Sequence, residues 1–251
     1  MKKLILAFSL MLVGASVSFA QIVTITPKKT VYTRKGKVSL KEKRTFVVTY
    51  PVVTGAIPAA TKKKLANTIN YWRVFETSLR ENLTEYDWLS ELSYEVNYNK
   101  NGILDIALMQ EGSGAYPSGR TVHLVVDLKT GEQIKFKDAF KTDSLGKLAA
   151  MVNAKLEVEK KEIIKLIDKG EFGESSEPNE MDPLKEQVGG LSFTAKTFDE
   201  FSISDKGVTF IYDAGFPHVI KAAQPDGRYF FTWAELKPFI KPAGLLGRFV
   251  S

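Results

Sequence analysis

The sequence has 251 residues, of which 44% are hydrophobic and 25% charged, and it contains no cysteine. Without cysteine the chain has no disulfides, no thiolate nucleophile and no thiolate metal ligands. The formal net charge of +6 falls to +4 without Lys2 and Lys3, which is too small a charge for a dedicated nucleic-acid-binding surface.

The first twenty residues predict a secretory signal peptide. Two lysines precede an apolar run at residues 4–13, and the small residues Ser18 and Ala20 occupy the −3 and −1 positions of a cleavage site. The apolar run is shorter than the roughly 20 residues that a membrane-spanning helix needs. We therefore expect cleavage between Ala20 and Gln21 and a soluble mature protein that is periplasmic or secreted.

The N-terminal portion, residues 21–110, begins with two strands. The β-branched residues of QIVTIT (21–26) and TFVVTYPVV (45–53) predict them. Eight basic residues and a single acid, Glu42, lie within residues 28–44. We favour an edge hairpin whose lysines oppose pairing with other chains. The alternative is a cationic face for anionic envelope polymers.

A helix is expected to begin at Pro58, because proline suits the first helical turn. Apolar residues then recur three or four positions apart, which predicts one continuous helix that packs against the core. These residues are Leu65, Ile69, Trp72, Phe75, Leu79 and Leu83.

A run of strands follows and predicts an antiparallel meander. Residues 91–110 read as a hairpin around the tight turn NKNG (99–102), with Leu92, Tyr94, Val96 and Tyr98 expected on one face. The segment EGSGAYPSGR (111–120) is expected to be a long loop leading to the next strand. In that strand, residues 121–128 alternate Val122, Leu124, Val126 and Leu128 with His123 and Asp127, and the turn KTGE (129–132) ends it.

The C-terminal portion, residues 111–251, also contains a second helix, expected at 142–168. An acidic insertion at 168–187 is expected to be a mobile surface segment, because it combines many acids with glycine and proline. Closing hairpins at 198–213 and around the turn QPDG (224–227) then lead to a short final helix near residue 233. The pattern predicts an α+β fold, in which an antiparallel β-meander sheet packs against two long helices and a short C-terminal helix. No Pro-, Gly- or Ser-rich boundary separates the two portions.

No catalytic constellation emerges from the sequence, so we predict no enzymatic activity, no cofactor and no metal. GSGAYPSG does not form the G-x-S-x-G elbow of a serine hydrolase, and its glycines lead into a strand, unlike those of a phosphate loop. His123 and Asp127 share a strand face but lie about 13 Å apart, too far for one metal ion. The alternative is an envelope glycan hydrolase that uses carboxylates which the sequence cannot rank, such as Glu111 and Asp127.

Two segments resemble a known family. Residues 114–141, GAYPSGRTVHLVVDLKTGEQIKFKDAFK, contain a Gly-Ala-aromatic-Pro loop, a strand ending in Asp-Leu-x-Thr-Gly and a Lys-Asp-x-Phe entry into a helix. Residues 203–240 are similar to the closing hairpin and terminal helix of the same family. This pattern resembles the RsiV-like extracytoplasmic domain, and the resemblance covers roughly residues 40 to 245. Such domains form the outer part of a lysozyme-sensing anti-sigma factor, adjoin peptidoglycan deacetylases, and occur in stand-alone exported proteins of unknown function.

The resemblance implies an α+β fold and a non-catalytic module that recognises a lysozyme-like protein or a peptidoglycan fragment. Many relatives have histidine where this chain has Tyr116, which argues against a metal or acid–base role for that loop. An anti-sigma role is not expected, because we find no transmembrane helix or sigma-binding segment. The loop at 111–120 and the segment 215–227 are the expected contact surface. Its candidate ligand-binding residues are Tyr116, Pro117, Arg120, His123, Phe216 and His218.

Overall fold

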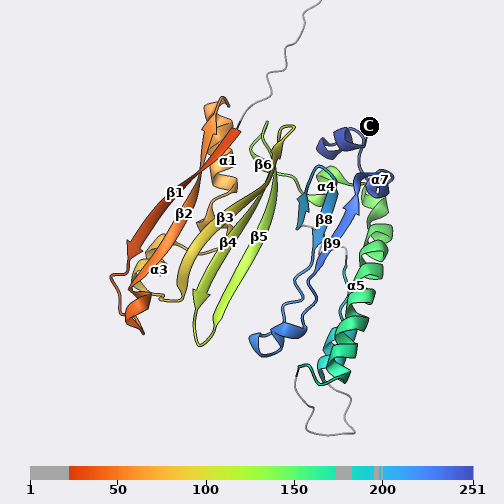
Figure 1. Cartoon of the computed structure of the whole chain (residues 1–251). Helices are drawn as coiled ribbons and strands as arrows, with labels where there is room; N and C mark the ends of the chain where they lie inside the picture. Colours follow the sequence, from red (N-terminus) through yellow and green to blue (C-terminus); the bar gives the residue numbers. More distant parts are fainter. Residues whose placement is uncertain (1–22, 173–182, 195–197, 199, 251) are drawn as a thin grey trace, which may run out of the picture.

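The computed structural model describes residues 23–172, 183–194, 198 and 200–250. The expected signal peptide, residues 1–20, lies outside the described residues. Figure 1 shows the large sheet, a small sheet and the long helix α5 following one another across the molecule. Short helices pack against one face of the large sheet. No helix among the described residues is long and apolar enough to cross a membrane.

Within the described residues the strands form two sheets, and the larger one has six strands in chain order. Neighbouring strands are antiparallel, except that β2 and β3 meet in parallel through only two residue pairs. The predicted meander is therefore confirmed for β3 to β6. The strands are β1 (Val23–Thr33), β2 (Thr45–Gly55), β3 (Leu89–Lys100), β4 (Ile103–Ser113), β5 (Pro117–Asp127) and β6 (Glu132–Gln133).

The basic hairpin lies at the edge of this sheet, as the sequence predicted, because β1 pairs only with β2. A short 3-10 turn, η1 (Lys41–Arg44), precedes β2. Arg34 is nevertheless buried, and its guanidinium donates hydrogen bonds to the carbonyl oxygens of Tyr86 (2.9 Å) and Leu89 (2.5 Å). This cation therefore joins the β1–β2 connection to the start of β3 and is not part of an exposed cationic face.

A β-bulge at Asn97 divides β3 between the two sides of the sheet. Val96 pairs with Ile106 and Tyr98 pairs with Asp105, so Asn97 has no partner residue in β4. Because one extra residue reverses the alternation of side chains, Tyr98 packs on the face opposite to Leu92. The expectation that these residues share one face was wrong for Tyr98.

Three short helices replace the first predicted long helix: α1 (Ala59–Thr68), α2 (Tyr71–Val74) and α3 (Leu79–Thr84). Capping explains the breaks. The Asn70 side chain accepts a hydrogen bond from Trp72 N (3.0 Å), and Ser78 forms a capping box with Glu81. Between them Glu76 has a φ of 52°, which no α-helix allows.

The second predicted helix is confirmed as α5 (Leu145–Asp168), and the 3-10 turn η2 (Thr142–Ser144) precedes it. The closing strands form a separate three-stranded antiparallel sheet, which packs between α5 and the six-stranded sheet. A predicted short C-terminal helix is also present. The remaining elements are α4 (Phe136–Ala139), α6 (Pro183–Gly189), β7 (Phe201–Ile203), β8 (Gly207–Ile211), η4 (His218–Ala223), β9 (Arg228–Thr232), α7 (Trp233–Leu236) and η5 (Leu245–Phe249).

The acidic insertion is not a loop throughout. Residues 173–182 lie outside the described residues, but α6 begins at Pro183, within the range expected to be a loop. Lys185 forms an ion pair with Asp168 at the end of α5, and Val188 is buried in a cluster with Ile163 and Ile167. The C-terminal end of the insertion is therefore helical because it buries apolar surface against α5.

A buried carboxylate joins the two sheets. Asp105 of β4 is fully buried, and its carboxylate accepts hydrogen bonds from Ser202 Oγ (2.5 Å), Ile203 N (2.6 Å) and Asn97 Nδ2 (3.2 Å). Burial raises the pKa of Asp105, although these hydrogen bonds oppose the shift. The bulge residue Asn97 thus helps to hold β7 against the meander.

Candidate binding surface

The hairpin that connects β4 and β5 is tighter than the sequence suggested. Ser113 pairs with Pro117, so only Gly114, Ala115 and Tyr116 form the turn. Gly114 N donates a hydrogen bond to Tyr116 O (3.2 Å) within it. The expectation of a long loop at 111–120 was therefore wrong, because the strands extend through most of this segment.

Trp88 supports this hairpin from one side. Its carbonyl oxygen accepts a hydrogen bond from Ser113 N (2.9 Å), and its indole Nε1 donates one to Ser118 Oγ (3.2 Å). Gly112 lies directly against the indole, since a Cβ there would come within 2.5 Å of a ring carbon and 2.4 Å of Trp88 O. A glycine inside a strand commonly marks such a close approach. Both strands of the hairpin are therefore fixed close to the turn.

The exposed Tyr116 ring stacks on the imidazole of His218. The ring centroids are 4.6 Å apart and the planes are inclined by 16°. Tyr116 is 58% exposed, and the residue after His218, Val219, is 82% exposed. The β4–β5 turn and η4 thus meet at the lower end of the molecule in Figure 1, although about a hundred residues separate them in the sequence.

Phe216 anchors the segment that carries His218. Its side chain is buried among Ile163, Ile167 and Ala223, and its backbone N donates a hydrogen bond to Gln224 Oε1 (2.9 Å). The sequence placed Phe216 on the contact surface. This expectation was wrong, because the aromatic ring fills the cluster beneath η4.

His123 is buried between the two sheets and not exposed as expected. Its backbone N donates a hydrogen bond to Glu200 Oε1 (2.9 Å), and its Nδ1 has no hydrogen-bond partner among the described residues. Burial, with a smaller contribution from Arg228, lowers the pKa of His123 to about 4. Burial likewise raises the pKa of Glu200, while the hydrogen bond from His123 and the charge of Arg120 oppose that shift.

The structure thus brings together only part of the predicted surface. Tyr116, Pro117 and His218 are exposed at the same end, and Val219 adjoins them. We call these four residues the tip surface. Arg120 is also exposed but lies further along β5. Val219 had no distinctive signal in the sequence, because its exposure depends on the 3-10 turn that Phe216 anchors.

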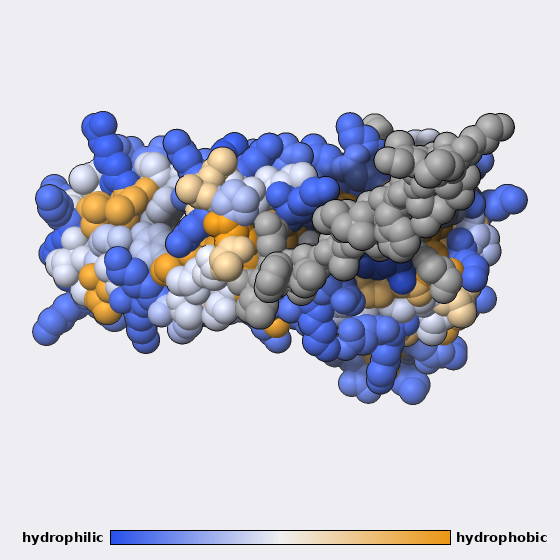
Figure 2. Space-filling model, turned by 90° about the horizontal axis from the view of Figure 1, so that it is seen from above, coloured by the Kyte–Doolittle hydropathy of each residue, from blue (hydrophilic) through white to orange (hydrophobic). Residues whose placement is uncertain are grey.

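The described residues contain no group of three or more His, Asp or Glu side chains that could hold a metal ion. Figure 2 views the molecule from the end opposite the tip surface, where many of the visible residues are hydrophilic. Figure 2 shows that its visible hydrophobic residues form small patches separated by hydrophilic ones.

No protein-family model and no curated protein matches this sequence. Among solved structures, the chain is similar to a DUF3298 family member from Bacteroides fragilis, with a TM-score of 0.55 and 14% identity over 92% of this chain and 97% of that chain. A DUF3298 family protein from Pseudomonas aeruginosa gives a TM-score of 0.48 and 14% identity over 88% of this chain and 95% of that chain. DUF3298 corresponds in general terms to the RsiV-like family, so the resemblance holds at the level of the α+β fold.

Proposed function

We propose that this chain is an exported, non-catalytic binding module of the cell envelope and that the tip surface contacts its partner. The expected partner is a lysozyme-like protein or a peptidoglycan fragment. The observation that carries this proposal is the exposed Tyr116–His218 stack, which two distant segments build together. Stacked, solvent-exposed rings provide apolar contact area and polar atoms at the same place.

Rigid support makes this surface suited to binding. Trp88 holds the hairpin beneath Tyr116, and Phe216 anchors the turn beneath His218. Because the backbone on both sides is already fixed, little conformational entropy is lost when a partner binds. Aromatic side chains with few rotatable bonds are correspondingly common in binding surfaces.

The choice of partner rests on the RsiV-like resemblance, which the DUF3298 fold similarity supports. It also rests on the predicted signal peptide, which would place the protein outside the cytoplasm. The tip surface by itself favours an extended protein or sugar partner over a small metabolite, because it projects from the molecule.

The test is to measure the affinity of the purified mature chain for lysozyme and for muropeptides by isothermal titration calorimetry. Tyr116→Ala is expected to weaken binding at least tenfold, since a central aromatic contact often contributes more than about 1.4 kcal/mol. Phe230→Ala is the matched control, because Phe230 is also an exposed aromatic residue, at 38%, but lies in the middle of β9, where its carbonyl oxygen accepts a hydrogen bond from Lys155 of α5. Equal affinities of both variants and the wild type would reject this surface.

The same muropeptides distinguish a binding module from a glycan hydrolase. Incubation with the protein should leave them unchanged by mass spectrometry. An unrelated protein purified in the same way is the control. Cleavage products that form with this protein but not with the control would replace the binding proposal with a catalytic one.

A further inference from the structure

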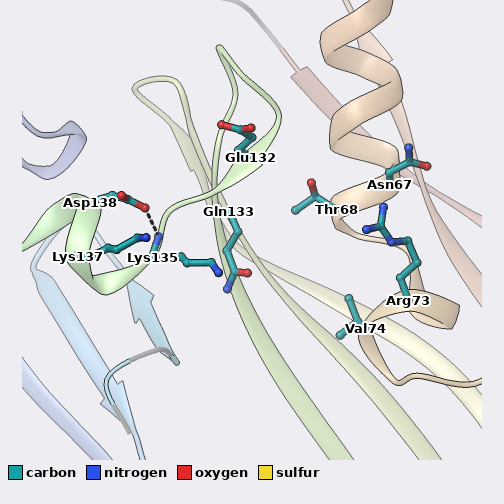
Figure 3. Close-up of a pocket in the computed structure, with 9 residues that line it drawn as sticks. All are labelled: Asn67, Thr68, Arg73, Val74, Glu132, Gln133, Lys135, Lys137 and Asp138. Carbon is teal, nitrogen blue, oxygen red and sulfur yellow. Dashed lines mark hydrogen bonds between the residues drawn. The ribbon is translucent and has the colours of Figure 1, made fainter. Parts of the chain in front are cut away.

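A groove of about 520 Å³ lies on another part of the molecule, between the α1–α2 corner and the β6–α4 segment. Figure 3 shows Lys135 and Lys137 on the α4 side, Arg73 on the α2 side and Gln133 between them. Asn67 and Thr68 line the groove from the end of α1. The volume falls within the range of small-molecule sites.

The cations that line this groove outnumber its carboxylates, by three to two. Across the described residues, the side chains of Arg73, Lys135 and Lys137 form no hydrogen bond or ion pair. Two carboxylates also line the groove, and only that of Glu132 is paired with a cation outside it. Glu132 forms an ion pair with Lys64, and Asp138 accepts a hydrogen bond from Lys135 N (3.0 Å). Three cationic groups therefore remain available to a ligand.

Buried neighbours position these cations. Lys135 and Lys137 flank Phe136, whose ring is buried against Phe140 and Phe198. On the other wall, Arg73 belongs to the same short helix as Tyr71, which is buried and donates a hydrogen bond from its hydroxyl to Thr49 O (2.7 Å).

A hydrogen bond also holds the two walls of the groove together. Thr68 Oγ1 of α1 donates to Gly131 O (2.7 Å) in the turn before β6. Gly131 has a φ of 75°. A Cβ added at this position would lie only 2.8 Å from backbone atoms of α1, so a larger residue would push the two walls apart. The fold therefore sets the spacing of the two backbone segments that carry the cations.

We propose that this groove binds a small ligand that carries at least two carboxylate or phosphate groups. The guanidinium of Arg73 can donate two parallel hydrogen bonds to a carboxylate or phosphate group. The ammonium groups of Lys135 and Lys137 place two further positive charges on the opposite wall. Gln133 and Asn67 add amide groups that hydrogen-bond polar substituents. Val74 is the only aliphatic hydrophobic side chain among the residues that line the groove, so a hydrophobic ligand is disfavoured.

The test is a titration of the mature chain with pyrophosphate, citrate and glucose, followed by isothermal titration calorimetry or amide chemical shifts. Pyrophosphate and citrate distinguish the two kinds of oxyanion, and glucose is the neutral comparison. Saturable binding of at least one anion, and none of glucose, is expected. Arg73→Gln and Lys135→Gln are each expected to weaken that binding at least fivefold without changing the melting temperature.

Matched controls separate a site from general electrostatic attraction. Arg80→Gln and Lys28→Gln remove the same charges at exposed positions on α3 and β1, outside the groove. They are expected to change the affinity less than twofold. The absence of saturable anion binding, or an equal loss in the controls and the groove variants, would overturn the proposal. Neither outcome bears on the tip surface, because the two sites share no residue.

Discussion

Tyr116 stacks on His218 across a gap of about a hundred residues in the sequence, with their ring centroids 4.6 Å apart. The contact joins the turn of the large sheet to the segment that precedes β9. The molecule therefore has a connection between its two sheets in addition to those made by Asp105 and by His123 with Glu200. Residues on both sides of that interface determine the geometry of the tip surface.

The hairpin depends on glycine at position 112. Gly112→Ala is expected to destabilise the protein by about 1–3 kcal/mol, because the new methyl group would overlap the Trp88 indole and carbonyl. Gly146→Ala, in the first turn of α5, is the matched control, since its Cβ meets nothing within 4 Å. It should be neutral or stabilising by up to about 1 kcal/mol. Urea unfolding measures both, and a neutral Gly112→Ala would contradict this account.

Asp105 is expected to hold the two sheets together. Asp105→Ala leaves the Ile203 N–H and the Ser202 hydroxyl without their acceptor, and each unsatisfied buried group costs about 1–3 kcal/mol. Ser202→Ala removes only one donor and should cost less than Asp105→Ala. Thermal and urea unfolding test this order, and the reverse order would show that the carboxylate is not the principal link.

His123 is expected to make stability depend on pH. Its pKa is lowered to about 4 in the folded protein, from an unfolded value near 6.5. A histidine with a lowered pKa contributes stability above its unfolded pKa, and this contribution is lost as the pH falls from 6.5 through 4. The loss is up to about 3 kcal/mol.

The contribution of His123 is measured as a difference between wild type and His123→Leu in urea unfolding at pH 7, 5.5 and 4. Asp105 and Glu200 have raised pKa values and act in the opposite direction, because their protonation favours the folded state as the pH falls. Wild type and His123→Leu both retain these acids and the backbone N–H that bonds Glu200, so the effects that the two proteins share are removed in the difference. The stability of wild type relative to His123→Leu should fall with pH. A constant difference would show that His123 is not buried in its neutral form.

Local signals predicted much of the fold. Asn101 and Gly102 adopt positive φ angles of 53° and 69° in a two-residue hairpin turn, as NKNG indicated. The stripe of α5 was also recognisable, because Leu148, Val152 and Leu156 are all buried on one side. In these cases the residues that determine the structure are close together in the sequence.

Other features depend on contacts that no local pattern encodes. The first long helix was predicted because the apolar spacing continues across Asn70 and Ser78, although both residues cap separate helices. The Ser-x-x-Glu pattern at Ser78 and Glu81 is the sequence signal that marks one of these boundaries. The burial of His123 and Phe216 had no such signal, since elements distant in the sequence cover both residues.

The central claim, that the tip surface binds the partner, is tested most directly by a double-mutant cycle. The affinities of wild type, Tyr116→Ala, His218→Ala and the double variant are measured for whichever of lysozyme or muropeptide binds. If the stacked rings bind as one unit, each single variant loses at least tenfold in affinity, and the double variant loses clearly less than the product of the two losses. Wild-type affinity in the double variant, with an intact circular dichroism spectrum, would contradict the claim.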